Sequence, residues 1–184
     1  MAEKLSRPVI ILERSSRGLN VRELGVLTAK ASRAAGLRGA VNVLITGSGK
    51  IRQLNLRFRG KRQVTDVLSF PSSISNGCAG DIAICLSVAV RNARMLGHSV
   101  SDEVQILILH GILHLAGYDH ENDRGEMKKK EISLRRRLGL PLGLIERTQG
   151  QSSLAVDRSS FAKPRNGRRS GQQPSTNFQR RSRT

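Results

Sequence analysis

One segment, Val104 to Leu115, limits the fold of this chain more than any other, because its apolar residues would cover every side of a helix. Ser101 precedes it as a capping residue, and Asp102 and Glu103 would lie in the first turn, where acidic side chains interact favourably with the helix dipole. A surface helix buries one apolar stripe, whereas a helix that is apolar all round must be enclosed by other elements. We therefore predict a helix from Ser101 to about Ala116 in the middle of the domain.

Strand and helix patterns alternate along the rest of residues 1–147. Helices are predicted after the capping residue Asn20, at about 48–56, and after Asp123. The order β-α-β-α-β-β-α-α-α predicts a single α+β domain, in which a four-stranded mixed sheet packs with about five helices. The remaining elements are four strands and one helix that ends before Gly97: strands Val9–Leu12, Ala40–Ile45, Thr65–Phe70 and Asp81–Ile84, and helix Leu86–Leu96.

The composition changes near Thr148. Residues 148–184 contain eight Lys or Arg against a single Asp, and only six of these residues are apolar. So few apolar side chains cannot offset the entropy lost on ordering, so we predict a disordered basic tail after a folded domain of residues 1–147. The tail is either solvated without a dedicated role or an electrostatic arm for RNA or the ribosome.

The net charge of +18 points to phosphate backbones as partners, with an acidic protein or an anionic membrane as the next interpretation. Cys78 and Cys85, the two cysteines, exclude a disulfide scaffold and an all-cysteine zinc module. The apolar run Val9–Leu12 is too short for a signal peptide, and no stretch approaches the roughly 18 apolar residues of a membrane span. We expect a soluble cytoplasmic protein without a membrane partner or a nucleotide cofactor.

Three histidines mark the end of the central helix: His110, His114 and His120. Side chains four residues apart lie one turn above each other, so His110 and His114 can both reach one ion at about 2.0–2.1 Å. Gly117 tolerates a left-handed helix end, which would turn the chain and bring His120 to the same ion. Three neutral imidazoles leave a fourth tetrahedral position for water, as in catalytic zinc sites. We predict one Zn²⁺ per chain; the alternative is that the histidines merely cap or pack.

The same spacing occurs in metzincin proteases, but those enzymes carry a Glu general base directly after the first histidine, where this chain has Gly111. A peptidase built this way would lack its base. Zinc can still lower the pKa of water towards about 7 for direct attack, with a cation stabilising negative charge on the electrophile. Such chemistry suits a phosphodiester in a strongly basic chain.

The run His110-Gly-Ile-Leu-His114-Leu-Ala-Gly117-Tyr-Asp-His120 resembles the pattern of the YbeY family of metal-dependent endoribonucleases, also called ribosomal RNA maturation factors. The resemblance covers about residues 50–138, and the order of strands and helices extends it to most of 1–147. A second block agrees: Asn55-Leu-Arg-Phe-Arg59-Gly-Lys61, Thr65-Asp-Val-Leu-Ser69-Phe-Pro71 and Gly80-Asp-Ile82.

The resemblance implies an endoribonuclease that prefers single strands and acts in small-subunit rRNA 3′-end maturation and ribosome quality control. It implies RNA, ribosomal RNA, the small ribosomal subunit and assembly factors as partners, and zinc on the three histidines. It further implies a catalytic arginine at Arg59, and substrate-binding roles for Lys61 and Ser69. From the residues alone, Arg59 reads as an exposed arginine at a helix end, although a guanidinium can hold two phosphate oxygens at once.

Several polar residues keep two interpretations. Asp66 and Asp81 either cap strand ends and turns or orient a ligand imidazole, and Asp119 either accepts from an imidazole or caps a turn. His98, after Gly97, is expected to be a surface residue. The basic runs of the last helix are either a solvated face or an RNA-docking face: Lys128–Lys130 and Arg135–Arg137.

Three functional classes therefore compete. The first is a zinc endoribonuclease, and the second is a ribosome-binding assembly factor whose zinc is largely structural. The third, a metallopeptidase, is disfavoured by Gly111 and by the positive charge.

Overall fold

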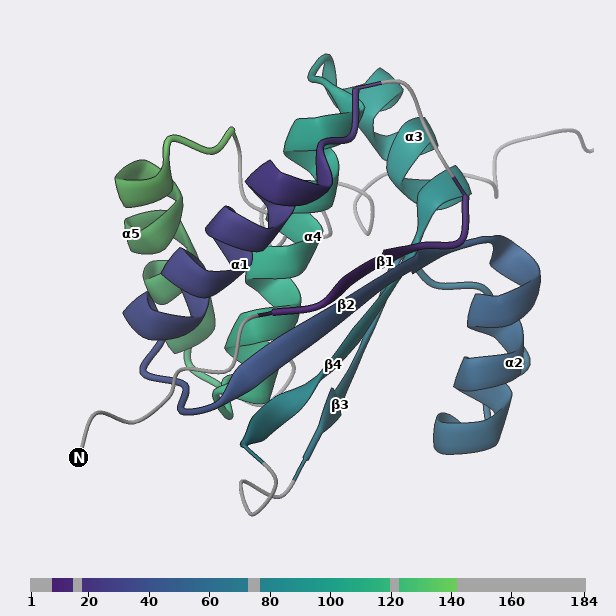
Figure 1. The fold of residues 1–184 in the computed structure, drawn as a ribbon, viewed down its shortest axis with the longest axis horizontal. Coiled ribbons are helices and arrows are strands. Elements are labelled where there is room, and N and C mark those ends of the chain that lie inside the picture. The colour runs from purple at the N-terminus through teal and green to yellow at the C-terminus, as the bar shows by residue number, and fades with distance from the viewer. Residues whose placement is uncertain (1–7, 15–17, 73–76, 120–122, 142–184) are drawn as a thin grey trace, which may run out of the picture.

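The computed structural model describes residues 8–14, 18–72, 77–119 and 123–141. The predicted tail of residues 148–184 and the predicted ligand His120 lie outside these ranges. Five helices and four strands form within them (Figure 1). Their bounds are β1 Ile10–Leu12, α1 Val21–Ala34, β2 Ala40–Thr46, α2 Ser48–Arg59, β3 Val67–Pro71, β4 Cys78–Cys85, α3 Leu86–Leu96, α4 Val100–Leu115 and α5 Glu126–Leu138.

The four strands form one mixed sheet in the order β1-β2-β4-β3. β1 pairs with β2 and β2 with β4 in parallel, whereas β3 runs antiparallel to β4. This confirms the predicted α+β fold with a four-stranded mixed sheet. β4 begins at Cys78, three residues before the predicted start at Asp81, because Cys78 pairs with Ala40 of β2 and Gly80 pairs with both β2 and β3, although glycine disfavours strands.

Helix α4 is the central helix of the molecule, as predicted. It packs against β3 and β4 of the sheet and against α1, α3 and α5. Its apolar side chains are buried on all sides, from Val104 to Leu113, in the main core cluster that also contains Val43 and Ile84 of the sheet. Helices α1, α4 and α5 lie on one side of the sheet and α2 on the other (Figure 1).

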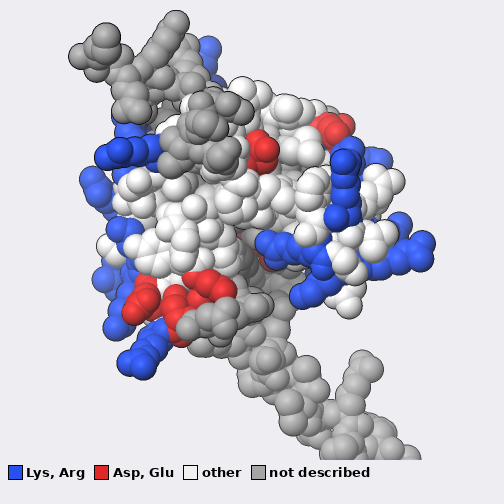
Figure 2. All heavy atoms as spheres, turned by 90° about the horizontal axis from the view of Figure 1, so that it is seen from below, with Lys and Arg blue, Asp and Glu red and all other residues white. Residues whose placement is uncertain are grey.

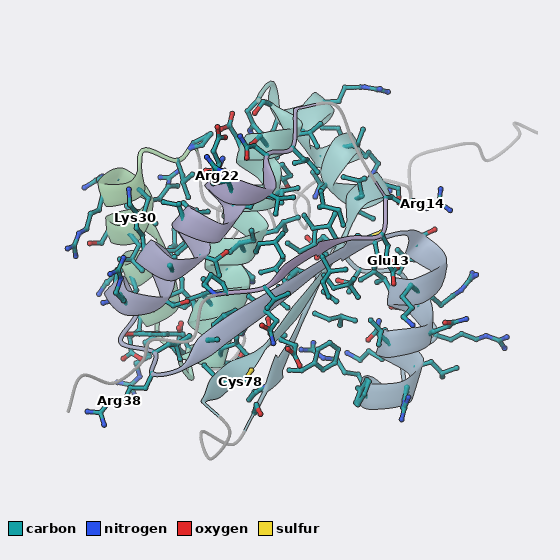
Figure 3. The ribbon with its side chains drawn as sticks, in the orientation of Figure 1. Glu13, Arg14, Arg22, Lys30, Arg38 and Cys78 are labelled. Carbon is teal, nitrogen blue, oxygen red and sulfur yellow. The ribbon has the colours of Figure 1, made fainter. Side chains whose placement is uncertain are left out.

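Helix α2 covers only part of its face of the sheet. A small buried cluster joins Ile51 of α2 to Leu68, Ala83 and Cys85. Towards the edge strand the same face opens to solvent, and Ile11 of β1 is 50% exposed. On the other face of the sheet, by contrast, the inner side of α1 covers the strands. Its Arg22 and Lys30 lie on the exposed outer side of the helix (Figure 3).

The predicted start of the central helix at Ser101 is wrong, because Ser99 caps α4. The Ser99 hydroxyl accepts from the Asp102 backbone N–H at 3.0 Å, and the Asp102 carboxylate accepts from the Ser99 backbone N–H at 3.3 Å. This reciprocal capping box requires an acidic residue three positions after the cap. Ser99 meets that requirement, whereas Val104 follows Ser101 at this spacing.

The other predicted helix starts are confirmed. The Asn20 side chain accepts from two backbone N–H groups of the first turn of α1. The Asp123 carboxylate accepts from the backbone N–H groups of Gly125 and Met127, at 2.7 Å each, before and in the first turn of α5. Among the helices of the described residues, none is both long and apolar enough to cross a membrane.

Candidate metal centre

The last turns of α4 bring His110 and His114 together. Their imidazole rings meet edge to face with centroids 4.7 Å apart, and the two Nε2 atoms are 3.0 Å apart. His110 is buried and His114 is half-buried. The predicted convergence of these two side chains on one point is therefore present in the fold.

Helix α5 supplies a carboxylate to this pair. The Nδ1 atom of His110 lies 3.2 Å from Oε2 of Glu131, and both residues are buried. An ionised carboxylate only accepts hydrogen bonds, so Nδ1 of His110 is the donor of this pair. In a neutral imidazole this tautomer leaves the lone pair on Nε2, the nitrogen that lies beside His114. This is the orientation that a carboxylate imposes on histidine ligands of metals.

Sequence reasoning gave Glu131 no functional role. Its position could have indicated such a role. Glu131 shares one face of the helix with Met127, Leu134 and Leu138, and a carboxylate on an apolar face must be buried with a polar partner. Glu131 is 1% exposed, and His110 is that partner.

The donor set fits a zinc ion. Two nitrogens of one tetrahedral zinc site, each about 2.0–2.1 Å from the metal, lie roughly 3.4 Å apart. The His110–His114 separation of 3.0 Å is slightly shorter, and a small rotation of either ring adjusts it. Within the described ranges no group of three His, Cys, Asp or Glu side chains is placed to hold a metal. The third predicted ligand, His120, lies outside them, so the complete ligand set stays a prediction.

Gly117 ends the helix in the way the sequence predicts. Its φ is 88°, in the left-handed region, where glycine is strongly favoured. The Gly117 N–H donates to the His114 carbonyl at 3.0 Å, and the Tyr118 N–H donates to the Leu113 carbonyl at 3.1 Å. This pair of hydrogen bonds closes the helix and turns the chain away immediately after the second histidine.

Gly111, directly after the first histidine, lies against the sheet. A Cβ atom at this position would be 2.9 Å from Cδ1 of Ile82 and 3.0 Å from Oγ of Ser69. A side chain there would require the Ile82 and Ser69 side chains to shift. Packing against the sheet therefore disfavours the glutamate of the metzincin motif at this position.

Comparison with known proteins identifies the family. The family model described as endoribonuclease YbeY matches residues 20–139, which include both histidines, Glu131 and the second sequence block. The chain belongs to the YbeY family.

YbeY relatives are similar along most of the chain. The endoribonuclease YbeY of Koribacter versatilis is 51% identical over 150 residues, which cover 82% of this chain and 98% of the relative. That of Solibacter usitatus is 53% identical over 108 residues, which cover 59% of this chain and 72% of the relative. Among solved structures, the solution structure of TM1509 from Thermotoga maritima matches with a TM-score of 0.52 and 26% identity, covering 84% of this chain and 99% of that one.

Arg59, the arginine that matches the YbeY pattern, is the last residue of α2. It is exposed, and it makes no hydrogen bond or ion pair in the described part of the chain. It lies on the α2 side of the sheet, and Lys and Arg side chains gather on this side as well as on the opposite side of the view, where a cluster of Asp and Glu side chains also lies (Figure 2). Lys61 is exposed beside it, after the left-handed Gly60 with φ 67°. The roles of both residues stay predictions.

Ser69 of β3 is buried beneath the metal centre. Its hydroxyl donates to the Gly111 carbonyl at 3.2 Å and so ties the edge strand to α4. In this position Ser69 supports the turn of the helix that carries His110. Its predicted contact with substrate stays a prediction.

Asp66 and Asp81 have local partners instead of histidines. The Asp66 carboxylate accepts from the Val67 N–H at 2.9 Å and thus caps the start of β3. Asp81 accepts from the Asn42 amide at 3.0 Å on the α2 face of the sheet. The capping interpretation of Asp66 is favoured. Asp81 lies on the α2 face of the sheet, whereas His110 and His114 lie on the opposite face, so Asp81 does not orient a ligand imidazole.

The expectation that His98 is a surface residue is wrong. Its side chain is 10% exposed, and Nε2 lies 2.8 Å from Oε2 of the fully buried Glu103. The Asn92 amide donates to the other oxygen of the same carboxylate at 3.2 Å. These contacts join α3 to the start of α4 and give the buried Glu103 carboxylate its hydrogen-bond partners. No sequence pattern indicates them, because the three residues come from different parts of the fold.

Proposed function

We propose that this YbeY protein is a zinc-dependent endoribonuclease that hydrolyses phosphodiesters of single-stranded RNA. The main support is that the Nε2 atoms of His110 and His114 lie 3.0 Å apart. The buried Glu131 carboxylate contacts the other nitrogen of His110 and so fixes the orientation of that ring. The names of the relatives support the reaction, and the net charge of +18 supports a polyanionic substrate. We further propose a cytoplasmic role in small-subunit rRNA 3′-end maturation and ribosome quality control, with the small subunit and assembly factors as partners.

The residues have separate tasks in this proposal. His110 and His114, with His120, would hold zinc, which when bound lowers the pKa of water to about 7 and neutralises charge on phosphate. Glu131 holds the proton of His110 on Nδ1 and keeps Nε2 free to act as a ligand. Arg59 would contact two phosphate oxygens and stabilise the negative charge that grows in the transition state.

Zinc content is the first test. Protein prepared without chelator is expected to contain one zinc per chain by elemental analysis. A strong chelator is expected to remove both the zinc and the cleavage of single-stranded RNA, and added Zn²⁺ is expected to restore them. If cleavage survives complete removal of zinc, the ribosome-binding assembly factor with a structural metal becomes the better explanation.

Glu131 is expected to raise the affinity of the site for zinc, although it does not contact the substrate. In Glu131→Gln the side chain keeps its size but loses the charge that fixes the His110 imidazole, so zinc affinity should fall about 10–100-fold. Competition against a chromophoric chelator measures this change. Saturating zinc should return the cleavage rate towards that of the wild type.

The matched control is Glu126→Gln, which removes a charge from the exposed first turn of the same helix. It should leave zinc affinity unchanged. An equal loss in both variants would mean that only the total charge of α5 matters and would remove the positioning role of Glu131.

A further inference from the structure

A pocket lies on the α2 face of the sheet, opposite to the face that carries His110 and His114. Its volume is about 520 Å³, within the range of small-molecule sites. The pocket is bounded by all four strands and by the last turns of α2. Its walls are mostly apolar: Val9, Ile11, Leu44, Leu54, Phe58 and Phe70.

Two aromatic rings form one wall of this pocket. Phe58 and Phe70 have ring centroids 4.9 Å apart at 59°, and Phe58 is 56% exposed. An exposed phenylalanine held by a second ring offers a flat surface for stacking. Nucleobases stack on such rings, with a binding contribution that does not depend on the identity of the base.

Two oxygen acceptors lie at the polar part of the pocket. The Asn42 amide donates to Oδ1 of Asp81 at 3.0 Å and to the sulfur of Cys78 at 3.6 Å. Cys78 is labelled in Figure 3 near the lower end of β4. Because these bonds use the amide N–H groups, Oδ1 of Asn42 and Oδ2 of Asp81 remain as acceptors without a donor among the described residues.

Cations flank the aromatic wall. The Arg57 guanidinium stacks over Phe58, with its central carbon 5.3 Å from the ring centroid. Arg59, Lys61 and Arg62 follow within a few residues, and all are exposed. A strand of phosphates can be bound by these side chains while an attached base enters the pocket.

We propose that this pocket binds one base of a single-stranded RNA chain and prefers bases that carry an exocyclic amino group. Phe58 would stack on the base, and Asp81 and Asn42 would accept from its amino group. Cytosine donates through its N4 amino group, whereas uracil places a carbonyl oxygen at the same position. The inference rests on the proposed function in taking RNA as the ligand, but Phe58, Asn42 and Asp81, which line the pocket, are separate from the metal centre.

An apolar protein segment fits the pocket less well. It would bury the exposed Asp81 carboxylate with the Asn42 amide as its single donor among the described residues, which is costly. A lysine or arginine from a protein would satisfy Asp81 but would meet the repulsion of Arg57 and its cationic neighbours. The combination of cations beside the pocket and oxygen acceptors in its lining therefore favours a nucleotide.

Binding of short oligocytidine and oligouridine to the full chain tests this inference. Fluorescence anisotropy measures both affinities, and a gel of the recovered RNA shows that the probes are intact. The wild type is expected to bind oligocytidine roughly tenfold more tightly. In Asp81→Asn an amide replaces an acceptor with a donor, so this preference should disappear or reverse. Phe58→Ala should weaken both probes about tenfold, and Phe58→Trp should retain the binding.

Met95→Ala is the matched control, because Met95 is 60% exposed on α3, outside the pocket. It should bind both probes like the wild type. Equal affinities of the wild type for the two probes, or unchanged binding by Phe58→Ala and Asp81→Asn, would overturn the inference and leave the pocket to a protein partner. Cleavage by His114→Ala tests the proposed function separately, since a lost metal centre leaves the preference for cytidine in place.

Discussion

A His114→Ala protein is expected to lose cleavage of single-stranded RNA together with its bound zinc. The substitution removes one of the two Nε2 atoms that meet at 3.0 Å, and Glu131 then orients His110 towards an incomplete site. Loss of an outer carboxylate partner costs roughly 10–100-fold in affinity or activity, and loss of a direct ligand should exceed that range. Elemental analysis and a cleavage assay on the same preparation measure the two losses together.

His98→Ala is the control for this experiment. His98 also pairs with a buried glutamate, but at the other end of α4. Its removal leaves Glu103 with one partner fewer, so the midpoint of thermal unfolding should fall while zinc content and cleavage per folded molecule remain. A His114→Ala protein that cleaves at the wild-type rate would remove the zinc mechanism.

Arg59→Glu is expected to reduce cleavage by about 10²–10³-fold, the effect of removing one donor to the charge of a transition state. Zinc content and the unfolding midpoint should stay close to those of the wild type, because the Arg59 side chain is exposed and has no partner in the described structure. Arg59→Lys should recover only part of the rate, since an ammonium group cannot bind two phosphate oxygens side by side.

Arg57→Glu and Lys61→Glu separate a specific contact from general electrostatics. Both residues are exposed and flank Arg59, so each change alters the local charge by the same amount. They should weaken RNA binding with a smaller effect on the rate at saturating RNA. Equal losses in all three variants would mean that the end of α2 attracts RNA only through its net charge.

The central helix was predictable from sequence because its evidence is local. Apolar residues from Val104 to Leu113 cover the whole helix, so no other location satisfies them. The meeting of His110 and His114 follows from helix periodicity in the same way. The end of the helix at Gly117 was predictable for a similar reason, since a left-handed helix end strongly favours glycine.

The missed features depend on residues that are distant in the sequence. Glu131 reaches His110 across 21 positions, and the role of Glu131 appears only when α5 packs against α4. The start of β4 was missed because Gly80 disfavours a strand by itself and is held there by pairing with β2 and β3, while Cys78 before it pairs with β2. The base pocket likewise combines Asn42, Asp81 and Phe58, which meet only after the sheet has formed.

The close approach of Gly111 to Ile82 and Ser69 limits how this scaffold can evolve. A glutamate introduced after His110 by a single substitution would place its Cβ against Ile82 and Ser69, so these two side chains would have to shift before it could fit. The packing distance between α4 and the sheet thus restricts the residue that follows His110, which the histidine spacing alone does not. An attempt to place a glutamate there would have to make room in β3 and β4 before changing the helix.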